Sequence, residues 1–199
     1  MMKAYRAVVL LLAMGAACTE FEVRVQAAQD QVAAKVPAVV FVIRHAEKPL
    51  VRDPDLAPMG YTRAAALPSL FVAKDGGPGR LPRPDAIFAT APSKKSNRPV
   101  ETVLPLGQAL HVRINALHMD DDAPGLARDV LSGKYAGKVV LICWHHGQIP
   151  AVVAALGVTD APAKWDEGVF DQIWKIEWVG GKARMTMLPE ELLKGDSTK

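Results

Sequence analysis

Four short apolar runs, separated by segments of helical length, constrain the fold of this chain more than any other feature. They are rich in β-branched residues and lie at residues 38–43, 86–89, 112–114 and 139–143. Such continuous runs are typical of strands that are buried on both faces of a parallel sheet. The intervening segments of helical length lie near residues 59–72, 98–110, 125–132 and 148–156. The alternation predicts an α/β fold, a single-domain three-layer sandwich in which helices cover both faces of a mainly parallel central sheet.

The carboxy-terminal part follows a different pattern. Residues 170–178 and 183–188 are separated by Gly180 and Gly181, which predicts a hairpin or an extension at the sheet edge. A chain of 199 residues, half of them apolar, suffices for one well-buried core but is short for two. We therefore expect a single domain over residues 38–199.

The amino terminus differs in character from the rest of the chain. Lys3 and Arg6 precede an apolar run at residues 7–17, and polar sequence follows that run. This is the layout of a secretory signal peptide. We expect residues 1–27 to be a signal peptide or a lipoprotein signal, and residues 28–37 to be a linker. No later stretch is long and apolar enough to predict a membrane span.

Two cleavage sites compete within this signal. The stretch from Gly15 to Cys18 resembles a bacterial lipoprotein box, in which Cys18 would be a lipid anchor, whereas a signal-peptidase site would end at Ala27. Both alternatives predict export, to the periplasm or to a lipid-anchored position at the cell envelope. The second cysteine is Cys143, so the domain has no disulfide framework. The net charge of +3 is dispersed, which argues against a nucleic-acid partner.

Charged residues and histidines directly follow three of the apolar runs. They are Arg44, His45, Glu47 and Lys48 after the first run, Ser93, Lys94, Lys95 and Arg98 after the second, and His145 and His146 after the fourth. Because ligand sites in open α/β sheets lie beyond the carboxyl ends of the strands, we expect these side chains to converge on one edge.

The chemistry of this set predicts phosphoryl transfer. The guanidinium groups of Arg44 and Arg98 offer planar pairs of donors that match phosphate oxygens. A neutral imidazole can attack phosphorus and form a covalent intermediate, while the flanking cations stabilise the transferring oxygens. The adjacent His145 and His146 lack the spacing of metal ligands, so we expect no metal and no cofactor.

Several blocks of the sequence carry a family resemblance. Residues 44–48, followed by residues 55–64, resemble the opening block of the histidine phosphatase superfamily, which contains phosphoglycerate mutases and acid phosphatases. The resemblance continues through residues 98–102 and 143–150, so it spans most of the chain after Pro37. It implies a phosphoglycerate mutase-like fold.

The resemblance also implies roles for individual residues. His45 would be the phosphorylated nucleophile, and Arg44 and Arg98 would bind the phosphate, with Lys48 as a further phosphate ligand. For the second histidine, an ungapped match to Ile149 and Pro150 selects His145. Some relatives carry a Trp-Glu-His version of this block, and a match to that version selects His146. We slightly favour His146.

The general acid stays open at this point. Asp120 and Asp121, together with Asp122, follow the third apolar run and are candidates, and Glu47 and Glu101 are further ones. An acidic run is also typical of a helix N-cap, so a structural role for these aspartates is the alternative.

The sequence thus predicts a metal-independent phosphohydrolase that acts through a phosphohistidine on a small phosphomonoester or a phosphorylated protein side chain. The asparagine that phosphoglycerate mutases carry after the first histidine has no counterpart in residues 47–50, which favours a small generic branch. One alternative is an exported module that binds a phosphate ligand without turnover, which would lack a carboxylate near the leaving group. The other is a phosphotransferase or mutase. The oligomeric state stays open.

Overall fold

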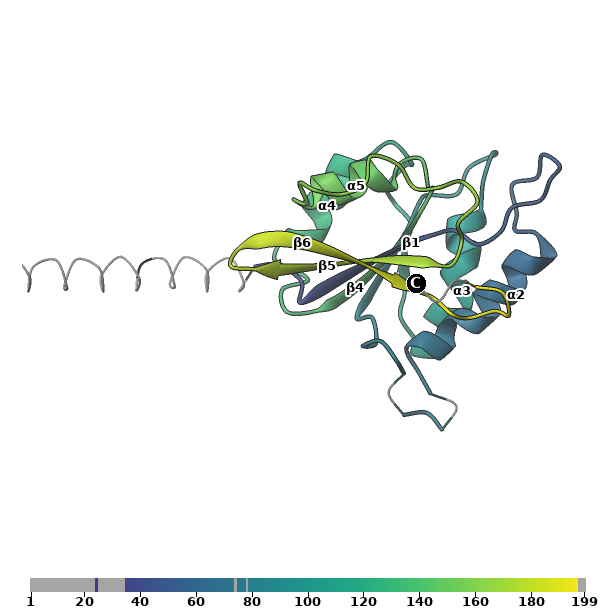
Figure 1. Cartoon of the computed structure of the whole chain (residues 1–199), viewed down its shortest axis with the longest axis horizontal. Helices are drawn as coiled ribbons and strands as arrows, with labels where there is room; N and C mark the ends of the chain where they lie inside the picture. Colours follow the sequence, from purple (N-terminus) through teal and green to yellow (C-terminus); the bar gives the residue numbers. More distant parts are fainter. Residues whose placement is uncertain (1–23, 25–34, 74, 78, 197–199) are drawn as a thin grey trace, which may run out of the picture.

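A computed structural model of the chain describes residues 24, 35–73, 75–77 and 79–196 (Figure 1). In this part of the chain, six strands form one sheet in the order β3-β2-β4-β1-β5-β6. They are β1 (Val39–Arg44), β2 (Ala86–Ala89), β3 (Ile114–Asn115), β4 (Val139–Trp144), β5 (Gln172–Val179) and β6 (Lys182–Pro189). The first four run parallel, whereas β5 lies antiparallel to β1 and β6 antiparallel to β5. The predicted α/β sandwich with a mainly parallel sheet is confirmed.

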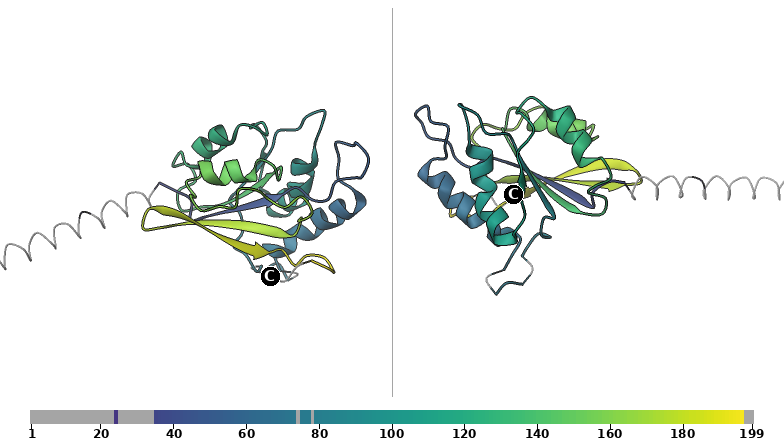
Figure 2. Two further views of the ribbon diagram at one scale, coloured as in Figure 1. Left: turned by 45° about the horizontal axis from the view of Figure 1, so that its top comes forward. Right: turned by 180° about the vertical axis from the view of Figure 1, so that it is seen from behind.

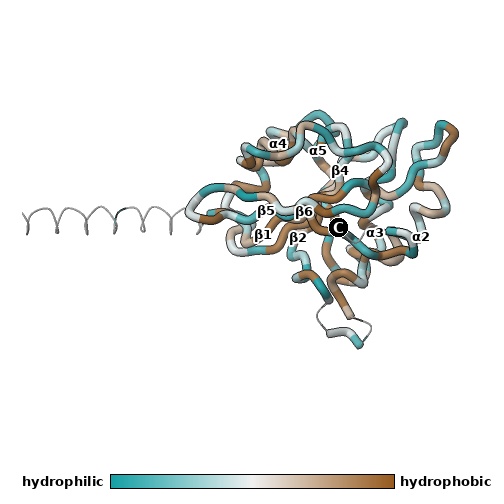
Figure 3. The backbone as a smooth tube through the Cα atoms, in the orientation of Figure 1, coloured by the Kyte–Doolittle hydropathy of each residue, from teal (hydrophilic) through white to brown (hydrophobic). Residues whose placement is uncertain are grey.

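Helices cover both faces of the sheet (Figure 2). They are α2 (Pro58–Ala66), the 3-10 helix η1 (Leu67–Leu70) and α3 (Arg98–Leu110) on one face, and α4 (Ala123–Val130) and α5 (Ile149–Ala155) on the other. Alternate side chains of β1 face the two layers: Val40 and Val42 pack with α4 and α5, whereas Phe41 and Ile43 pack on the opposite face. The apolar central strands, visible in Figure 3, therefore belong to two cores at once.

Two predicted elements differ in extent. The helix expected at residues 59–72 ends as α2 at Ala66 and continues as the short η1, because Pro68 has no N–H to extend an α-helical ladder. The strand expected at residues 112–114 is the two-residue β3, Ile114–Asn115.

The carboxy-terminal hairpin forms as predicted. Gly180 and Gly181 join β5 to β6 with φ values of 58° and 75°, a left-handed conformation that suits glycine in a two-residue hairpin turn. Ile173 and Ile176 of β5 are fully buried beside β1, so the hairpin extends the core past the parallel strands.

A buried ion cluster ties the carboxy-terminal segment to the loop after β1. The guanidinium of Arg63 lies 2.9 Å from Glu47, 3.2 Å from Glu190 and 2.9 Å from Asp196. Burial raises the pKa of Glu190 to about 8, although Arg63 opposes the shift. The sequence gives no sign of this cluster, because its members lie far apart along the chain.

The predictions for the amino terminus fall outside this structure. Apart from residue 24, the expected export signal at residues 1–27 with Cys18, and residues 28–34 of the linker, lie outside the described residues. None of the helices in the described part of the chain has the length and apolar character that a membrane span requires.

Candidate active site

The site lies beyond the carboxyl ends of the parallel strands. The backbone N–H of His45 donates to the carbonyl of Trp144 over 3.0 Å, and that of Thr90 donates to Cys143 over 3.3 Å. These bonds hold the ends of β1, β4 and β2 side by side. The side chains that follow each strand therefore share one edge, as the sequence predicts.

His45 is held as a neutral ring with a defined tautomer. Its side chain is buried, and Nδ1 lies 2.7 Å from the carbonyl oxygen of Ala46. Because a carbonyl only accepts, Nδ1 must carry the proton, which leaves the lone pair on Nε2. Burial, reinforced by His145, Arg44 and Arg98, lowers the pKa of His45 to about 3. At neutral pH, Nε2 is therefore an unprotonated potential nucleophile.

His145 is the histidine that lies against His45. The two rings are 5.2 Å apart between centroids and meet edge to face. Burial, with Arg98 next, lowers the pKa of His145 to about 4, so this ring is also neutral near pH 7. The slightly favoured His146 is its half-buried neighbour, whose Nδ1 has no hydrogen-bond partner. The geometry thus brings His145, rather than His146, against the ring of His45.

Arg44 is anchored on one side and free on the other. Its Nη1 donates to the carbonyl oxygens of Glu167 and Val169, the latter over 3.0 Å. The guanidinium stacks 3.7 Å from the ring centre of Phe170. Its Nε and Nη2 are buried and have no partner. Burial lowers the pKa of Arg44 to about 10, which still leaves the group charged at neutral pH.

Arg98, like Arg44, has one anchored and one unpartnered nitrogen in its guanidinium group. Its Nη1 donates to the backbone carbonyl of Asp53 over 2.7 Å, whereas its buried Nε has no partner. Arg98 is the first residue of α3, so the helix fixes the base of its side chain. Two anchored guanidinium groups therefore keep free donors at this edge of the sheet.

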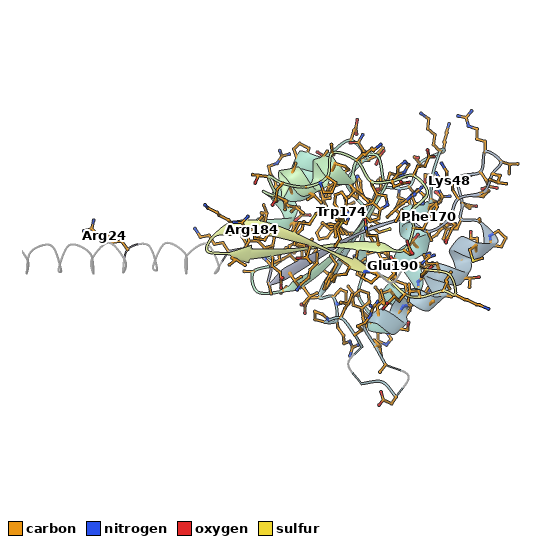
Figure 4. The ribbon with its side chains drawn as sticks, in the orientation of Figure 1. Arg24, Lys48, Phe170, Trp174, Arg184 and Glu190 are labelled. Atoms are coloured by element: carbon orange, nitrogen blue, oxygen red, sulfur yellow. The ribbon has the colours of Figure 1, made fainter. Side chains whose placement is uncertain are left out.

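Lys48 does not join this pair. Its Nζ lies 2.7 Å from Oε1 of Glu167, and both side chains are largely exposed. Lys48 and Phe170 lie at the same end of the molecule, opposite Arg184 (Figure 4). The ammonium group of Lys48 is thus engaged at the rim, where it neutralises Glu167 instead of pointing a free charge at the site.

Among the candidate acids, Asp120 and Asp121 border the pocket. Oδ1 of Asp120 is buried without a partner, and burial, with repulsion from Asp121, raises the pKa of Asp120. Trp144 is fully buried and donates from Nε1 to the Asp120 carbonyl over 3.0 Å. Trp144 therefore helps to fix the backbone of Asp120.

The other carboxylates have structural partners. Asp122 accepts from the backbone N–H of Gly125 as the N-cap of α4 and also contacts His118 at 3.0 Å. Glu47 pairs with Arg63, and Glu101 accepts from Leu56 N–H and the Tyr61 hydroxyl. The carboxylates of Asp122, Glu47 and Glu101 therefore have structural roles in the fold.

A pocket of about 600 Å³ opens over this edge. It is lined by Thr90, Ala91, Ser93, Lys94, Lys95, Ser96, Arg98, Met119, Asp120, Asp121 and His145. It therefore combines cations, hydroxyl groups, two carboxylates and the histidine that contacts His45. Among the described residues, no group of three or more His, Cys, Asp or Glu side chains could hold a metal ion.

Buried polar atoms without partners gather here. In the described part of the chain they are Arg44 Nε and Nη2, Thr90 Oγ1, Ser96 Oγ, Arg98 Nε, Asp120 Oδ1 and His146 Nδ1. All follow the carboxyl ends of the parallel strands. An unpaired buried polar group costs about 1–3 kcal/mol, so a cluster of them is a place where a polar ligand can be bound. Most are donors, which suits an oxyanion.

Thr90 and Ser96 are not among the residues that the sequence predicts for the site. Thr90 directly follows β2, and Ser96 lies two residues before Arg98, so position after a strand was the available signal. A hydroxyl is too common in loops to be selected on that ground alone.

The fold matches solved structures of phosphate-handling proteins. The protein histidine phosphatase SixA, solved with tungstate, aligns at TM-score 0.54 and 13% identity over 76% of this chain and 97% of its own. An Entamoeba histolytica phosphoserine phosphatase variant, in complex with phosphoserine, aligns at TM-score 0.53 and 13% identity over 78% of this chain and 98% of its own. An Escherichia coli K-12 protein assigned as an alpha-ribazole-5′-P phosphatase gives TM-score 0.51 and 15% identity, covering 77% and 96%. Neither a protein-family model nor a curated protein matches the sequence.

Proposed function

We propose that this chain, which has the fold of the histidine phosphatase superfamily, is a phosphohydrolase that transfers a phosphoryl group through His45 to water. One observation carries the proposal: Arg44 and Arg98, which keep unpartnered buried donors, lie close enough to act electrostatically on a histidine whose Nε2 is unprotonated. That combination is what binding and attacking a phosphate monoester requires.

Binding places the phosphoryl group between the two arginines. The free Nε and Nη2 of Arg44 and the free Nε of Arg98 donate to its oxygens. The hydroxyl groups of Thr90 and Ser96 supply further donors from the pocket wall. Because the two guanidinium groups are anchored before substrate binds, they stabilise the charge of the transition state at little reorganisation cost.

The first chemical step forms the phosphoenzyme. Nε2 of His45 attacks phosphorus while the bond from phosphorus to the leaving oxygen breaks. Asp120, whose pKa is raised by burial, gives its proton to that oxygen, so the product leaves as an alcohol. His145, next to His45, donates a hydrogen bond from its neutral ring to the transferring oxygens.

The second step returns the enzyme to its starting state. Asp120, now ionised, takes a proton from a water molecule, and the water oxygen attacks phosphorus. The bond from Nε2 to phosphorus breaks, which releases inorganic phosphate and neutral His45. No net proton or charge remains on the protein.

The presence of a carboxylate in the pocket favours turnover over a binding module. Asp120 and Asp121 line the same cavity as His145 and Arg98, where the leaving group would lie. SixA, solved with tungstate, supports an oxyanion-binding role for this fold. For the substrate we propose a small phosphomonoester or a phosphorylated protein side chain. We also propose export through the apolar segment at residues 7–17.

Phosphate release tests this proposal. The full chain is assayed with p-nitrophenyl phosphate, glycerol phosphate and a phosphoserine peptide in the presence of a chelator. His45→Ala should abolish release, whereas His111→Ala, an exposed histidine outside the site, should retain it. Release by His45→Ala at the parent rate would contradict the proposal. Tight vanadate binding without any turnover would instead support the binding module.

A further inference from the structure

A projecting loop stands beside the mouth of the candidate site. Residues 48–54 extend from the end of the molecule that carries the carboxyl edge of the parallel strands (Figure 1). The loop is bonded to the neighbouring one: Asn97 N–H donates to the Pro54 carbonyl over 2.8 Å, and Arg98 Nη1 donates to that of Asp53. Its position relative to the site is therefore built into the fold.

The tip of this loop is apolar and fully exposed. Leu50 has a relative exposure of 108% and Val51 of 74%. Leu50 is the most exposed large apolar residue in the described part of the chain. The outer side of the loop is coloured as apolar in Figure 3. Two adjacent aliphatic side chains in water, at a fixed position beside an active site, indicate a contact that the isolated chain lacks.

Four basic residues lie on this loop and on the loop bonded to it. Lys48 and Arg52 flank it, and Lys94 and Lys95 are exposed on the bonded neighbouring loop. Lys48 pairs with Glu167, but Arg52, Lys94 and Lys95 form no ion pair within the described residues. The net charge of +3 over the whole chain does not by itself predict this local group of basic residues.

Two acidic residues of these loops, Asp53 and Asp55, accept hydrogen bonds from groups within the loops. The carboxylate of Asp53 accepts from the backbone N–H of Asp55, and that of Asp55 accepts from the side chain of Asn97. Asp121 lines the same pocket as the two lysines. Asp53 and Asp55 keep their negative charge in the adjoining part of the loop. We define the outer rim as residues 48–52 with Lys94 and Lys95: Arg52, Lys94 and Lys95 are its unpaired cations, and Leu50 and Val51 form its apolar tip.

We propose that this rim docks on an anionic lipid bilayer, with Leu50 and Val51 entering the acyl boundary and the basic side chains at the headgroups. A projecting aliphatic tip flanked by lysine and arginine is the arrangement that binds such interfaces. A protein partner would have to supply a matching acidic cavity, whereas a bilayer accepts a convex tip without one.

Docking in this way points the pocket at the membrane surface. Resting on the proposed phosphatase function, we assign the substrate class as a phosphomonoester held at that surface, such as a lipid with a terminal phosphate. Lys94 and Lys95 belong to the rim and also line the pocket, so the proposed docking surface is continuous with the pocket.

A local fluorescence probe tests the docking independently of catalysis. Trp144, Trp165 and Trp174 are buried and Trp178 is partly buried, so Leu50→Trp in the full chain adds an exposed reporter at the tip, measured against the parent chain as background. With vesicles of phosphatidylcholine and phosphatidylglycerol in equal parts, its emission should shift to the blue and brominated lipids should quench it. Val179→Trp, 66% exposed before the β5-β6 turn, is the matched control and should be unaffected.

The contribution of the lysines and the insertion of residue 50 are tested separately in the vesicle experiment. Lys94→Gln with Lys95→Gln should weaken the vesicle binding of the Leu50→Trp chain by about fivefold per charge. Absence of quenching at residue 50, or equal quenching at residue 179, would overturn the docking. An acidic protein would then be the partner class that fits the rim.

The substrate class has its own readout. Leu50→Ser with Val51→Ser should lower phosphate release from vesicle-borne phosphatidic acid at least several-fold and leave release from p-nitrophenyl phosphate unchanged. An equal effect on both substrates would overturn the assignment. Failure of the parent chain to hydrolyse either substrate would instead contradict the proposed function, and the quenching result would still stand.

Discussion

Nδ1 of His45 lies 2.7 Å from the carbonyl oxygen of Ala46, and this one hydrogen bond determines which nitrogen of the ring can react. The loop that supplies the carbonyl is itself fixed, because the N–H of Ala46 donates to Oγ1 of Thr102 over 2.9 Å. Burial then keeps the ring neutral. Orientation, tautomer and charge of the proposed nucleophile all follow from the first turn after β1.

The acid side of the pH profile should reflect these lowered pKa values. Because the pKa of His45 is about 3 and that of His145 about 4, both rings stay unprotonated far below the ordinary histidine range. We expect kcat/KM to fall only as the pH approaches 4. The check is a profile from acid to neutral pH on a soluble phosphomonoester. A fall centred at the ordinary histidine pKa of about 6.5 would contradict this electrostatic account.

Asp120→Asn should separate substrates by leaving group. An alkyl phosphate needs a proton on the departing oxygen, so its kcat should fall by about 10²–10⁴-fold. An activated ester such as p-nitrophenyl phosphate needs no proton to leave, so formation of its phosphoenzyme should be little changed. Because the acid must be protonated, activity on alkyl phosphates should also decline as pH rises through the Asp120 pKa. Asp121→Asn, on the exposed neighbour, is the matched control, and an equal loss there would reassign the acid.

Single substitutions should distinguish the two adjacent histidines. The ring centroids of His145 and His45 are 5.2 Å apart. His145→Ala should therefore lower kcat by about 10²-fold or more, which is the loss expected when one hydrogen-bond donor to the transition state is removed. His146→Ala should have a smaller effect. Steady-state kinetics of both variants on one substrate decide the matter, and the reverse order of effects would restore the sequence preference for His146.

The buried cation of Arg63 should matter for stability. Arg63→Met leaves the carboxylates of Glu47 and Asp196 and the carboxyl group of Glu190 without their shared partner, so the free energy of unfolding should drop by about 3–5 kcal/mol. Urea unfolding near pH 7 measures the change. A loss below about 1 kcal/mol, the range of surface ion pairs, would show that the cluster is not buried as described.

Glu190→Gln is the informative companion to that variant. The folded pKa of Glu190, about 8, lies above its unfolded value, so its contribution to stability is present at low pH and lost as pH rises through 8. The glutamine variant should therefore lose less stability than the parent between about pH 4 and pH 9, the range that spans both pKa values. An equal loss of stability in the variant and the parent between the two pH values would contradict the raised pKa.

The strands were predictable from sequence because burial on both faces leaves an uninterrupted apolar signal. The run 38–43 differs from β1 by one residue at each end, and the run 139–143 ends one residue before β4 does. The 3-10 turn at Leu67–Leu70 was less visible, since the apolar pattern runs through Pro68 and only the missing N–H breaks the helix.

The site was predictable as far as its residues follow strands. Arg44, His45 and Arg98 lie where the parallel topology brings strand ends together. What the sequence does not show are contacts made by distant loops. Glu167 neutralises Lys48 from more than a hundred residues away, and the indole of Trp144 donates to the backbone carbonyl of Asp120. Such partners depend on the packed structure.

The most direct test of the central claim is to isolate the phosphoenzyme. The Asp120→Asn chain is mixed rapidly with p-nitrophenyl phosphate, quenched in alkali because phosphohistidine is acid-labile, and digested for mass spectrometry. Without the carboxylate that activates water, one phosphoryl group should accumulate on the peptide that contains His45, and on no other. A phosphoryl group on another residue, or phosphate release by Asp120→Asn,His45→Ala at the rate of Asp120→Asn alone, would contradict a phosphohistidine mechanism at this site.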